Sequence, residues 1–378
     1  MTISPSVARK MALLIAPGGP AFTQTSAQAF AADLRSGAEK AQTIVQELTR
    51  LDAAAEVARD VSPVVLDRPG WAYSAAQSID AMIELSHSSV RGFNSVTVGA
   101  ALAAISRFVM GQYDPYTCAI REDEQENDAQ LHGDVQRRGD GELCGRKKAP
   151  GRILLNAPVI AQFCAQYDLD QRDLCTWVCV HEFTHAVQYQ EAPWLKDYVL
   201  DHFVRILGDE KTSDEKIGGK KRSGAEEDGM FESDVMRELT AVMSLLEGHA
   251  EFVMNAVPVA YMPGKNRIIS AMKSKRKEKN ALMRALAKNL SLDKKAQQYK
   301  DGAQFVQKVH ELAGQEVFNR VWASPATVPT FEELSSPEAW IARITADTGD
   351  AIIPADLAVS DDAAAATSEA ETSSALES

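Results

Sequence analysis

The amino-acid sequence predicts a mainly α-helical fold, in which a bundle of helices surrounds one central helix beside a few short strands. Long stretches of the 378 residues carry apolar side chains at the three-to-four-residue spacing of amphipathic helices. Segments with the composition of β-strands are short and few. Hydrophobic residues make up 45% of the chain and charged residues 25%, which is typical of a globular protein that buries a large core.

In the first part of the chain, helical and strand-like patterns alternate. The segment Asp67-Arg68-Pro69-Gly70 interrupts the apolar pattern, and it predicts a stop between a strand and the next helix. The helix expected over residues 96–110 is apolar almost all round, which predicts that it is buried on every side. The expected helices are residues 26–58, 73–85 and 96–110, and the expected strands are Ser62–Leu66 and Arg152–Asn156.

The second part of the chain is predicted to be helical, with polar segments between the helices. Residues 121–151 and 208–229 are rich in charged and polar side chains, so we interpret both as polar insertions. The segment 354–378 holds six acidic residues and no Lys or Arg, which predicts a disordered acidic tail. We therefore expect an N-terminal segment (1–25), one domain (26–353) and the tail. The expected helices are residues 173–192, 234–257, 268–290 and 293–312.

The composition argues against several classes of protein. A net charge of -13 disfavours binding to nucleic acid, and the basic run from Lys273 to Lys279 is interpreted as a solvated helix face. The apolar run Met11–Ala16 is too short for a signal peptide or a membrane span. The five cysteines are irregularly spaced, and we interpret Cys175 and Cys179 as small buried residues rather than a metal pair. We predict a cytoplasmic protein without a nucleic-acid or membrane partner.

The strongest indication of chemistry is the helical motif HEFTH, residues 181–185. Residues four apart on a helix lie above one another, so the imidazoles of His181 and His185 can converge on one zinc ion. Glu182 borders the same face and can accept a proton from a water molecule at the metal, as metal-assisted hydrolysis requires. The alternative is a pair of hydrogen-bonded histidines on a buried helix face, and the spacing favours zinc over it.

A third zinc ligand has to come from another segment. The longer pattern HExxHxxGxxH is excluded, because Gln188 stands at its glycine position. The segment LLEGHAE, residues 245–251, offers Glu247 and Glu251 one helical turn apart, so that one could bind zinc while the other orients a ligating histidine. His249 is the rival ligand, although its apolar neighbours favour a buried core histidine. The spacing favours Glu247 and leaves His249 and Glu251 open.

One aromatic residue is a further catalytic candidate. The phenol of Tyr299 could donate a hydrogen bond to the oxyanion of a tetrahedral intermediate. The alternative interpretation is an aromatic side chain that packs on a helix, and it is the commoner one.

Several sequence segments along the chain are similar to those of a known family. It resembles the zincin-like metallopeptidase family of actinobacteria and relatives, whose members are labelled hydrolases or proteins associated with deazaflavin-coenzyme biosynthesis. The resemblance extends over residues 26–345 and implies a mostly helical zincin-like fold with a gluzincin-like site, in which His181, His185 and Glu247 bind zinc and Glu182 is the general base. It is carried by the segments DRPGW (67–71), GQYD (111–114), HEFTHAVQ (181–188), PWL (193–195), LEGHAE (246–251), QYKDGA (298–303), FV (305–306) and VW (321–322).

The function expected from these observations is zinc-dependent hydrolysis, most simply of a peptide. The substrate would be a peptide or a small amide. One alternative is a zinc-stabilised binding or scaffold protein that has the fold without the activity. Another is hydrolysis of a non-peptide amide in coenzyme metabolism.

Overall fold

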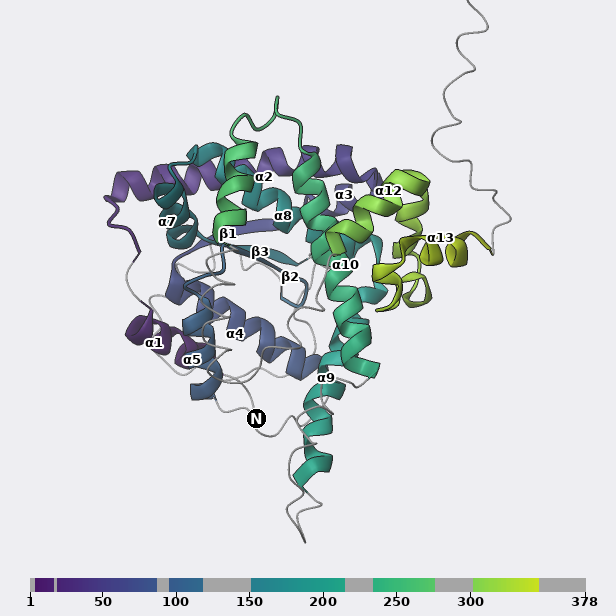
Figure 1. Ribbon diagram of the computed structural model, residues 1–378. Coiled ribbons are helices and arrows are strands. Elements are labelled where there is room, and N and C mark those ends of the chain that lie inside the picture. Colours follow the sequence, from purple (N-terminus) through teal and green to yellow (C-terminus); the bar gives the residue numbers. More distant parts are fainter. Residues whose placement is uncertain are drawn as a thin grey trace, which may run out of the picture.

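A computed structural model describes residues 4–16, 19–86, 95–117, 151–214, 234–275 and 302–346. Within these residues, helices surround one small sheet (Figure 1), which confirms the mainly α-helical fold. The α-helices are α1 (Pro5–Ile15), α2 (Gln24–Thr49), α3 (Asp52–Ala58), α4 (Arg68–Leu85), α5 (Ser95–Ile105), α7 (Ala157–Tyr167), α8 (Gln171–Glu191), α9 (Trp194–Asp214), α10 (Asp234–Ala256), α12 (Gly302–Asn319) and α13 (Pro337–Ala346). Residues 265–275 are also helical. Short 3-10 turns are η1 (Arg320–Trp322), η2 (Pro325–Thr327) and η3 (Glu333–Ser335).

The sheet has three strands, β1 (Ser62–Leu66), β2 (Gly111–Asp114) and β3 (Arg152–Asn156), in the order β1-β3-β2. Strand β1 is parallel to β3, and β2 is antiparallel to it. The bounds of β1 and β3 match the two strands expected from the sequence. Strand β2 is an addition to that expectation, and it forms an edge of the sheet.

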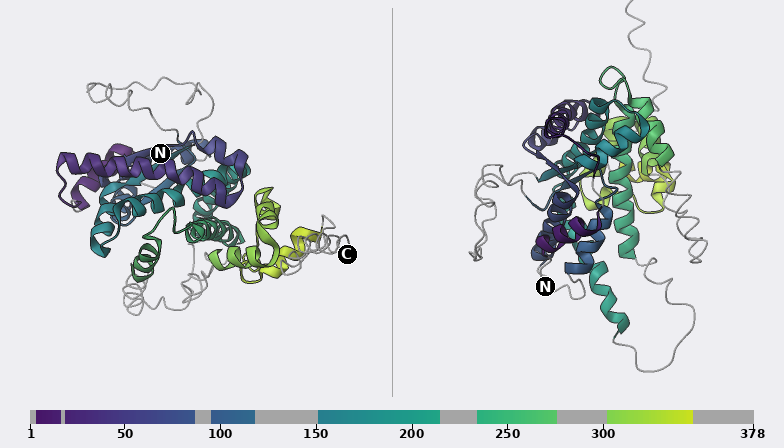
Figure 2. Two further views of the ribbon diagram at one scale, coloured as in Figure 1. Left: turned by 90° about the horizontal axis from the view of Figure 1, so that it is seen from above. Right: turned by 90° about the vertical axis from the view of Figure 1, so that its left-hand side faces the viewer.

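Side chains of the central strand β3 pack into two different helical layers. All of its residues are buried, and their side chains alternate between the two faces. Ile153 and Leu155 belong to the larger core, with α2, α8 and α10, whereas Leu154 packs with α1, α4 and α5. Figure 1 shows α2, α7 and α8 on one side of the sheet and α1, α4 and α5 on the other. In the left view of Figure 2, α12 and α13 lie to one side of the molecule, away from α1.

Helix α8 lies deep in the larger core because α2 packs closely against it. A side chain at Gly37 of α2 would place its Cβ 3.0 Å from the backbone of Cys175 on α8. The thiols of Cys175 and Cys179 are buried beside α2, as the sequence analysis expected, and burial raises the pKa of both. Neither cysteine belongs to a metal-ligating cluster among the described residues.

The predicted helix 26–58 and the predicted start of the next helix at residue 73 were both wrong in detail, whereas β1 ends before residues 67–70 as predicted. The first is two helices, α2 and α3, because Arg50 adopts a left-handed conformation with φ 53° and ends α2. Helix α4 begins at Arg68 rather than at residue 73. The Asp67 side chain accepts a hydrogen bond of 2.7 Å from the Gly70 N–H, and Pro69 suits the first turn, so the segment starts a helix.

The full burial predicted for residues 96–110 was also wrong. Helix α5 ends at Ile105, and only one of its faces is buried, while Val96 and Ile105 are exposed. Residues 208–214, predicted to belong to a polar insertion, continue helix α9. Among the described helices, none has the length and hydropathy that a membrane span requires.

Several other expectations concern residues outside the described ranges. These are residues 121–150, residues 215–229, the tail 354–378, and the predicted helical residues 276–290 and 293–301. The division into an N-terminal segment, one domain and a tail stays a prediction.

Candidate metal centre

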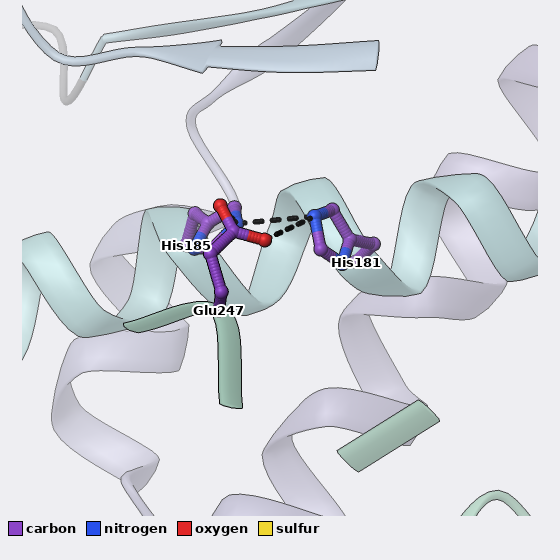
Figure 3. Close-up of side chains that lie close together, drawn as sticks. All are labelled: His181, His185 and Glu247. Atoms are coloured by element: carbon purple, nitrogen blue, oxygen red, sulfur yellow. Dashed lines mark hydrogen bonds and ion pairs between the residues drawn. The ribbon is translucent and has the colours of Figure 1, made fainter. Parts of the chain in front are cut away.

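Helix α8 brings two histidines of the HEFTH motif together, and helix α10 supplies a carboxylate beside them. Helix α8 begins after Asp170, whose side chain accepts a hydrogen bond from the Asp173 N–H, and it runs without interruption to Glu191. His181 and His185, one turn apart, point to the same side of the helix, and Glu247 of α10 faces them (Figure 3). The side chain of His185 is 10% exposed and that of Glu247 57%, so the group lies at the boundary between core and solvent.

The spacing of the three side chains fits a single metal ion. The Nε2 atoms of His181 and His185 lie 3.2 Å apart. His181 Nε2 lies 3.5 Å from Glu247 Oε2, and His185 Nε2 lies 3.6 Å from the other carboxylate oxygen, Oε1. Zinc at about 2.0–2.1 Å from each ligand places tetrahedral ligand atoms ~3.3 Å from one another. The three observed distances are close to this edge length, and the two-imidazole, one-carboxylate set is one that zinc accepts.

Gln188 holds His185 in the tautomer that a metal ligand needs. The Gln188 side-chain Nε2 donates to the Leu246 carbonyl at 3.0 Å and lies 3.0 Å from His249 Nδ1. This orientation leaves Gln188 Oε1 facing His185 Nδ1 at 2.8 Å, so that Nδ1 carries the proton and donates it. The lone pair of His185 is therefore on Nε2, which faces His181 and Glu247.

His181 is held in an apolar setting. Its Nδ1 lies 3.2 Å from the Met254 sulfur atom, a weak acceptor. Burial and the neighbouring His185 lower the pKa of His181 to about 3. Because the imidazole is neutral near pH 7, it can offer a lone pair to a cation.

Glu182 is buried beside the metal-ligating group and points towards strand β2. Burial and the charge of Glu247 raise the pKa of the Glu182 carboxyl well above its ordinary value, although the Tyr113 N–H donates a hydrogen bond to it. Gly111 makes room for this carboxylate, because a Cβ on Gly111 would collide with Glu182 Oε1. The strand thus positions a carboxylate that is not itself one of the three clustered ligands.

A cavity of about 740 Å³ opens beside these residues. Apolar side chains form much of its wall, and the polar groups of His181, Glu182 and Glu247 lie together on one side. Such a combination of an apolar wall with a few convergent polar groups is typical of a small-molecule or peptide site. Its apolar lining residues are Val109, Met110, Trp177, Val178, Met254, Ile269 and Met272.

The remaining candidates from the sequence lie in different places. His249 is 1% exposed and packs between Phe318 and Trp322, with ring centroids 5.0 Å and 5.4 Å away, so it is not one of the three clustered groups. Glu251 lines the cavity, but Gln188 is the partner of His185 Nδ1, the position considered for Glu251. Tyr299 lies outside the described residues.

Gln188, Gly111 and Tyr113 position the site, a role that the sequence did not assign to them. Gln188 follows His185 by three positions, so helical periodicity placed it near the histidine, but nothing indicated its contacts with a second helix. Gly111 and Tyr113 belong to the short strand β2, whose composition lacks the alternation that predicts a strand.

Comparison with known proteins points to a family and to a fold. A sequence model of the family described as zincin-like metallopeptidase matches residues 87–341. Among solved structures, a crystallised protein from Chloroflexus aurantiacus, described as a candidate hydrolase with a novel fold, has a similar fold with a TM-score of 0.51. Its sequence is 23% identical, and the alignment covers 90% of this chain and 98% of that chain. No curated protein sequence matches the chain.

Proposed function

The chain belongs to the zincin-like metallopeptidase family, and from this premise we propose that it is a zinc-dependent hydrolase that cleaves peptide bonds. The observation that carries the proposal is the convergence of two imidazole nitrogens and a carboxylate within tetrahedral spacing, next to a buried second carboxylate. His181, His185 and Glu247 would hold the zinc ion. Zinc, when bound, polarises a substrate carbonyl and lowers the pKa of water.

Glu182 is the residue to which we assign proton transfer. Burial raises the pKa of its carboxyl, which makes the carboxylate a stronger proton acceptor than an exposed glutamate. The carboxylate would accept a proton from the attacking water and later deliver it to the leaving amine. Strand β2 supports this role because the Tyr113 N–H and the space at Gly111 hold the carboxylate in place.

The edge strand β2 favours a peptide substrate. Asn156 N–H donates to the Met110 carbonyl at 2.8 Å, and Gln112 is opposite Leu154, so these residues direct their backbone groups towards β3. By alternation, Gly111 and Tyr113 direct theirs away from β3, towards the Glu182 side. The Tyr113 N–H already donates to Glu182, so an extended peptide would pair with the other groups of this edge and present its own carbonyl to the site.

The number of protein ligands favours an enzyme over a scaffold. Structural zinc sites have four protein ligands, whereas catalytic sites have three and leave one position open. Within the described ranges, the cluster contains three such residues, and Glu247 is largely exposed on the cavity side. This arrangement supports catalysis and argues against a purely structural zinc ion.

The test compares Glu182→Gln with Glu191→Gln, a substitution at the end of the same helix. We expect wild type and both variants to bind zinc, measured by elemental analysis after dialysis. Glu182→Gln should lower kcat on a peptide library by about 10²–10⁴-fold, and Glu191→Gln should leave it unchanged.

Undiminished turnover of Glu182→Gln would contradict the mechanism. Zinc binding without cleavage of any peptide would contradict the peptidase assignment, and a screen of acylated amines would then test the amide alternative. The association with deazaflavin-coenzyme biosynthesis stays a prediction.

A further inference from the structure

Exposed large apolar side chains are concentrated on helices α1 and α5 and on the turn that follows α5. Leu13 and Leu14 of α1 are 65% and 81% exposed, and Phe108, in the turn after α5, is 64% exposed. With Ile15, Val96 and Ile105, they make up six of the twelve exposed large hydrophobic residues that the described ranges contain. We call the exposed residues of α1, α5 and 106–108 the α1–α5 face. Such clustering marks interaction surfaces, whereas single exposed apolar residues need no explanation.

The fold itself does not need these side chains. Helix α1 contacts its neighbours through small residues, because its buried positions are Ala8 and Ala12. On α5, Gly99 faces α1, and a Cβ there would lie 3.1 Å from the Ala8 Cα. Close backbone approach therefore fixes α1 against α5, and the large exposed apolar residues of the two helices lie outside this contact.

The charge of this face differs from that of the whole chain. Residues 4–16 and 95–110 contain Arg9, Lys10 and Arg107 and no acidic residue, while the net charge of the chain is -13. Arg9 and Lys10 are exposed and precede Leu13 and Leu14 by one helical turn, so basic and apolar groups share one surface. The guanidinium of Arg107 lies 5.7 Å from the centre of the Phe108 ring.

The positive charges favour one kind of binding partner for the α1–α5 face over another. In a symmetric dimer, the same patch of each copy meets its twin, so the cations would face each other and repel. An anionic partner would be attracted instead. Helices that combine outward Leu and Phe side chains with Lys and Arg are typical of segments that lie in the interface of an anionic lipid bilayer.

We propose that the α1–α5 face docks on the surface of a bilayer that contains anionic lipids. The sequence predicted no membrane partner, because the apolar run Met11–Ala16 is too short for a membrane span and the pattern of residues 96–110 predicted a buried helix. Val109 and Met110, which line the cavity beside Glu182, directly follow Phe108. Docking would therefore place the α1–α5 face against lipid next to an edge of that cavity. The proposal does not depend on hydrolytic activity.

Sedimentation of the full-length protein with vesicles tests the proposal. We expect binding to vesicles of phosphatidylcholine mixed with phosphatidylglycerol, weaker binding at high salt, and little binding to phosphatidylcholine alone. The double variant Arg9→Gln/Lys10→Gln should lose about 30-fold in affinity, because each basic residue near an anionic surface contributes about fivefold. The double variant Leu13→Ser/Leu14→Ser should also lose binding.

The matched control is Val259→Ser/Tyr261→Ser, which removes two other exposed hydrophobic residues, 53% and 48% exposed, from a turn after α10. It should bind vesicles like the wild type. Because the substituted residues are exposed, all variants should fold, and circular dichroism would check this. Absence of binding to anionic vesicles would overturn the proposal. Self-association in light scattering that Leu13→Ser/Leu14→Ser abolishes would also overturn it, in favour of a dimer.

Discussion

The two sides of the small sheet are built on different principles. On the side of α8 and α10, large side chains fill the core, and buried polar groups such as Gln188 and His249 bond to one another across helices. On the side of α1, α4 and α5, the core consists mainly of alanines around Trp71, Leu102 and Leu154. The first side orders specific side chains for chemistry. The second relies on close backbone contact, which leaves its large apolar residues available on the outside.

Strand β2 connects the two sides. Below the sheet, its Asp114 carboxylate accepts a hydrogen bond from Arg152 Nε at 3.0 Å, within an ion pair that is almost fully buried. At the outer edge of the sheet, the N–H of the adjacent Tyr113 donates to Glu182. Substitutions on the two sides of the sheet therefore test whether the free energy of unfolding and the rate of catalysis depend on different residues.

The largest effect should come from breaking the buried ion pair. Arg152→Met leaves Asp114 buried without its cation, so we expect the free energy of unfolding in urea to fall by about 3–5 kcal/mol. Arg205→Met is the control, since Arg205 pairs with Asp201 on an exposed helix surface at 3.6 Å. It should cost less than about 1 kcal/mol. Equal losses in the two variants would show that the buried pair contributes nothing beyond a surface pair.

Substitution of one glycine on each side of the sheet should affect kcat in one variant and the free energy of unfolding in the other. Gly111→Ala places a methyl group against Glu182, and a misplaced catalytic group should reduce kcat by about 10²-fold while zinc binding persists. Gly99→Ala presses on Ala8 across the α1–α5 contact and should lower the unfolding free energy while leaving kcat unchanged. Peptidase assays and urea titrations on both variants measure this. The comparison fails if Gly99→Ala reduces kcat as much as Gly111→Ala does.

Gln188 should matter for zinc affinity because it links both ligand-bearing helices. Gln188→Leu removes the acceptor for His185 Nδ1 and the donor to the Leu246 carbonyl, next to Glu247. Loss of such a supporting bond weakens metal binding about 10–100-fold, which competition with a chromogenic chelator would measure. Gln190→Leu, two residues further along α8, is the control and should bind zinc like the wild type. Unchanged affinity in Gln188→Leu would contradict the role.

The histidines of the larger core should make stability depend on pH. Burial lowers the pKa of His310 to about 4, and its ring stacks on Phe252 with centroids 4.2 Å apart. In the unfolded chain, His310 takes up a proton near pH 6.5, whereas in the folded protein it does not until about pH 4. The free energy of unfolding is therefore highest above pH 6.5, as far as His310 is concerned, and it decreases as the pH falls towards 4. His310→Phe should therefore gain stability relative to wild type between pH 6.5 and 4, by at most about 2–3 kcal/mol. A difference that does not change with pH in urea titrations would contradict this.

The sequence predicted the local parts of the site better than its long-range parts. His181 and His185 share a face because of helical spacing alone, and α8, α10, β1 and β3 have clear patterns. Glu247 could only be favoured over His249 and Glu251, because which face of α10 meets α8 depends on packing. Spacing within one segment does not contain that information.

Other features of the fold were not predicted, because their sequence patterns were weak or were misinterpreted. Strand β2 has four residues, including a glycine and a glutamine, so no alternation marks it. Residues 67–70 correctly marked the end of β1, but Asp67 as N-cap with Pro69 in the first turn is also a helix start, which was missed. The apolar composition of α5 indicated burial, whereas one of its faces is covered by small residues and the other is exposed.

The smallest effect on stability should accompany the outward residues of α1. Leu13→Ser/Leu14→Ser changes two exposed side chains and should alter the unfolding free energy by no more than about 0.5 kcal/mol. Leu154→Ala, in the core of the same layer and fully buried, should cost about 2–5 kcal/mol. Urea titrations of both variants measure the contrast. If the double variant lost as much as Leu154→Ala, its leucines would be part of the core. Near-neutral stability together with lost vesicle binding would instead mean that these leucines serve an external partner.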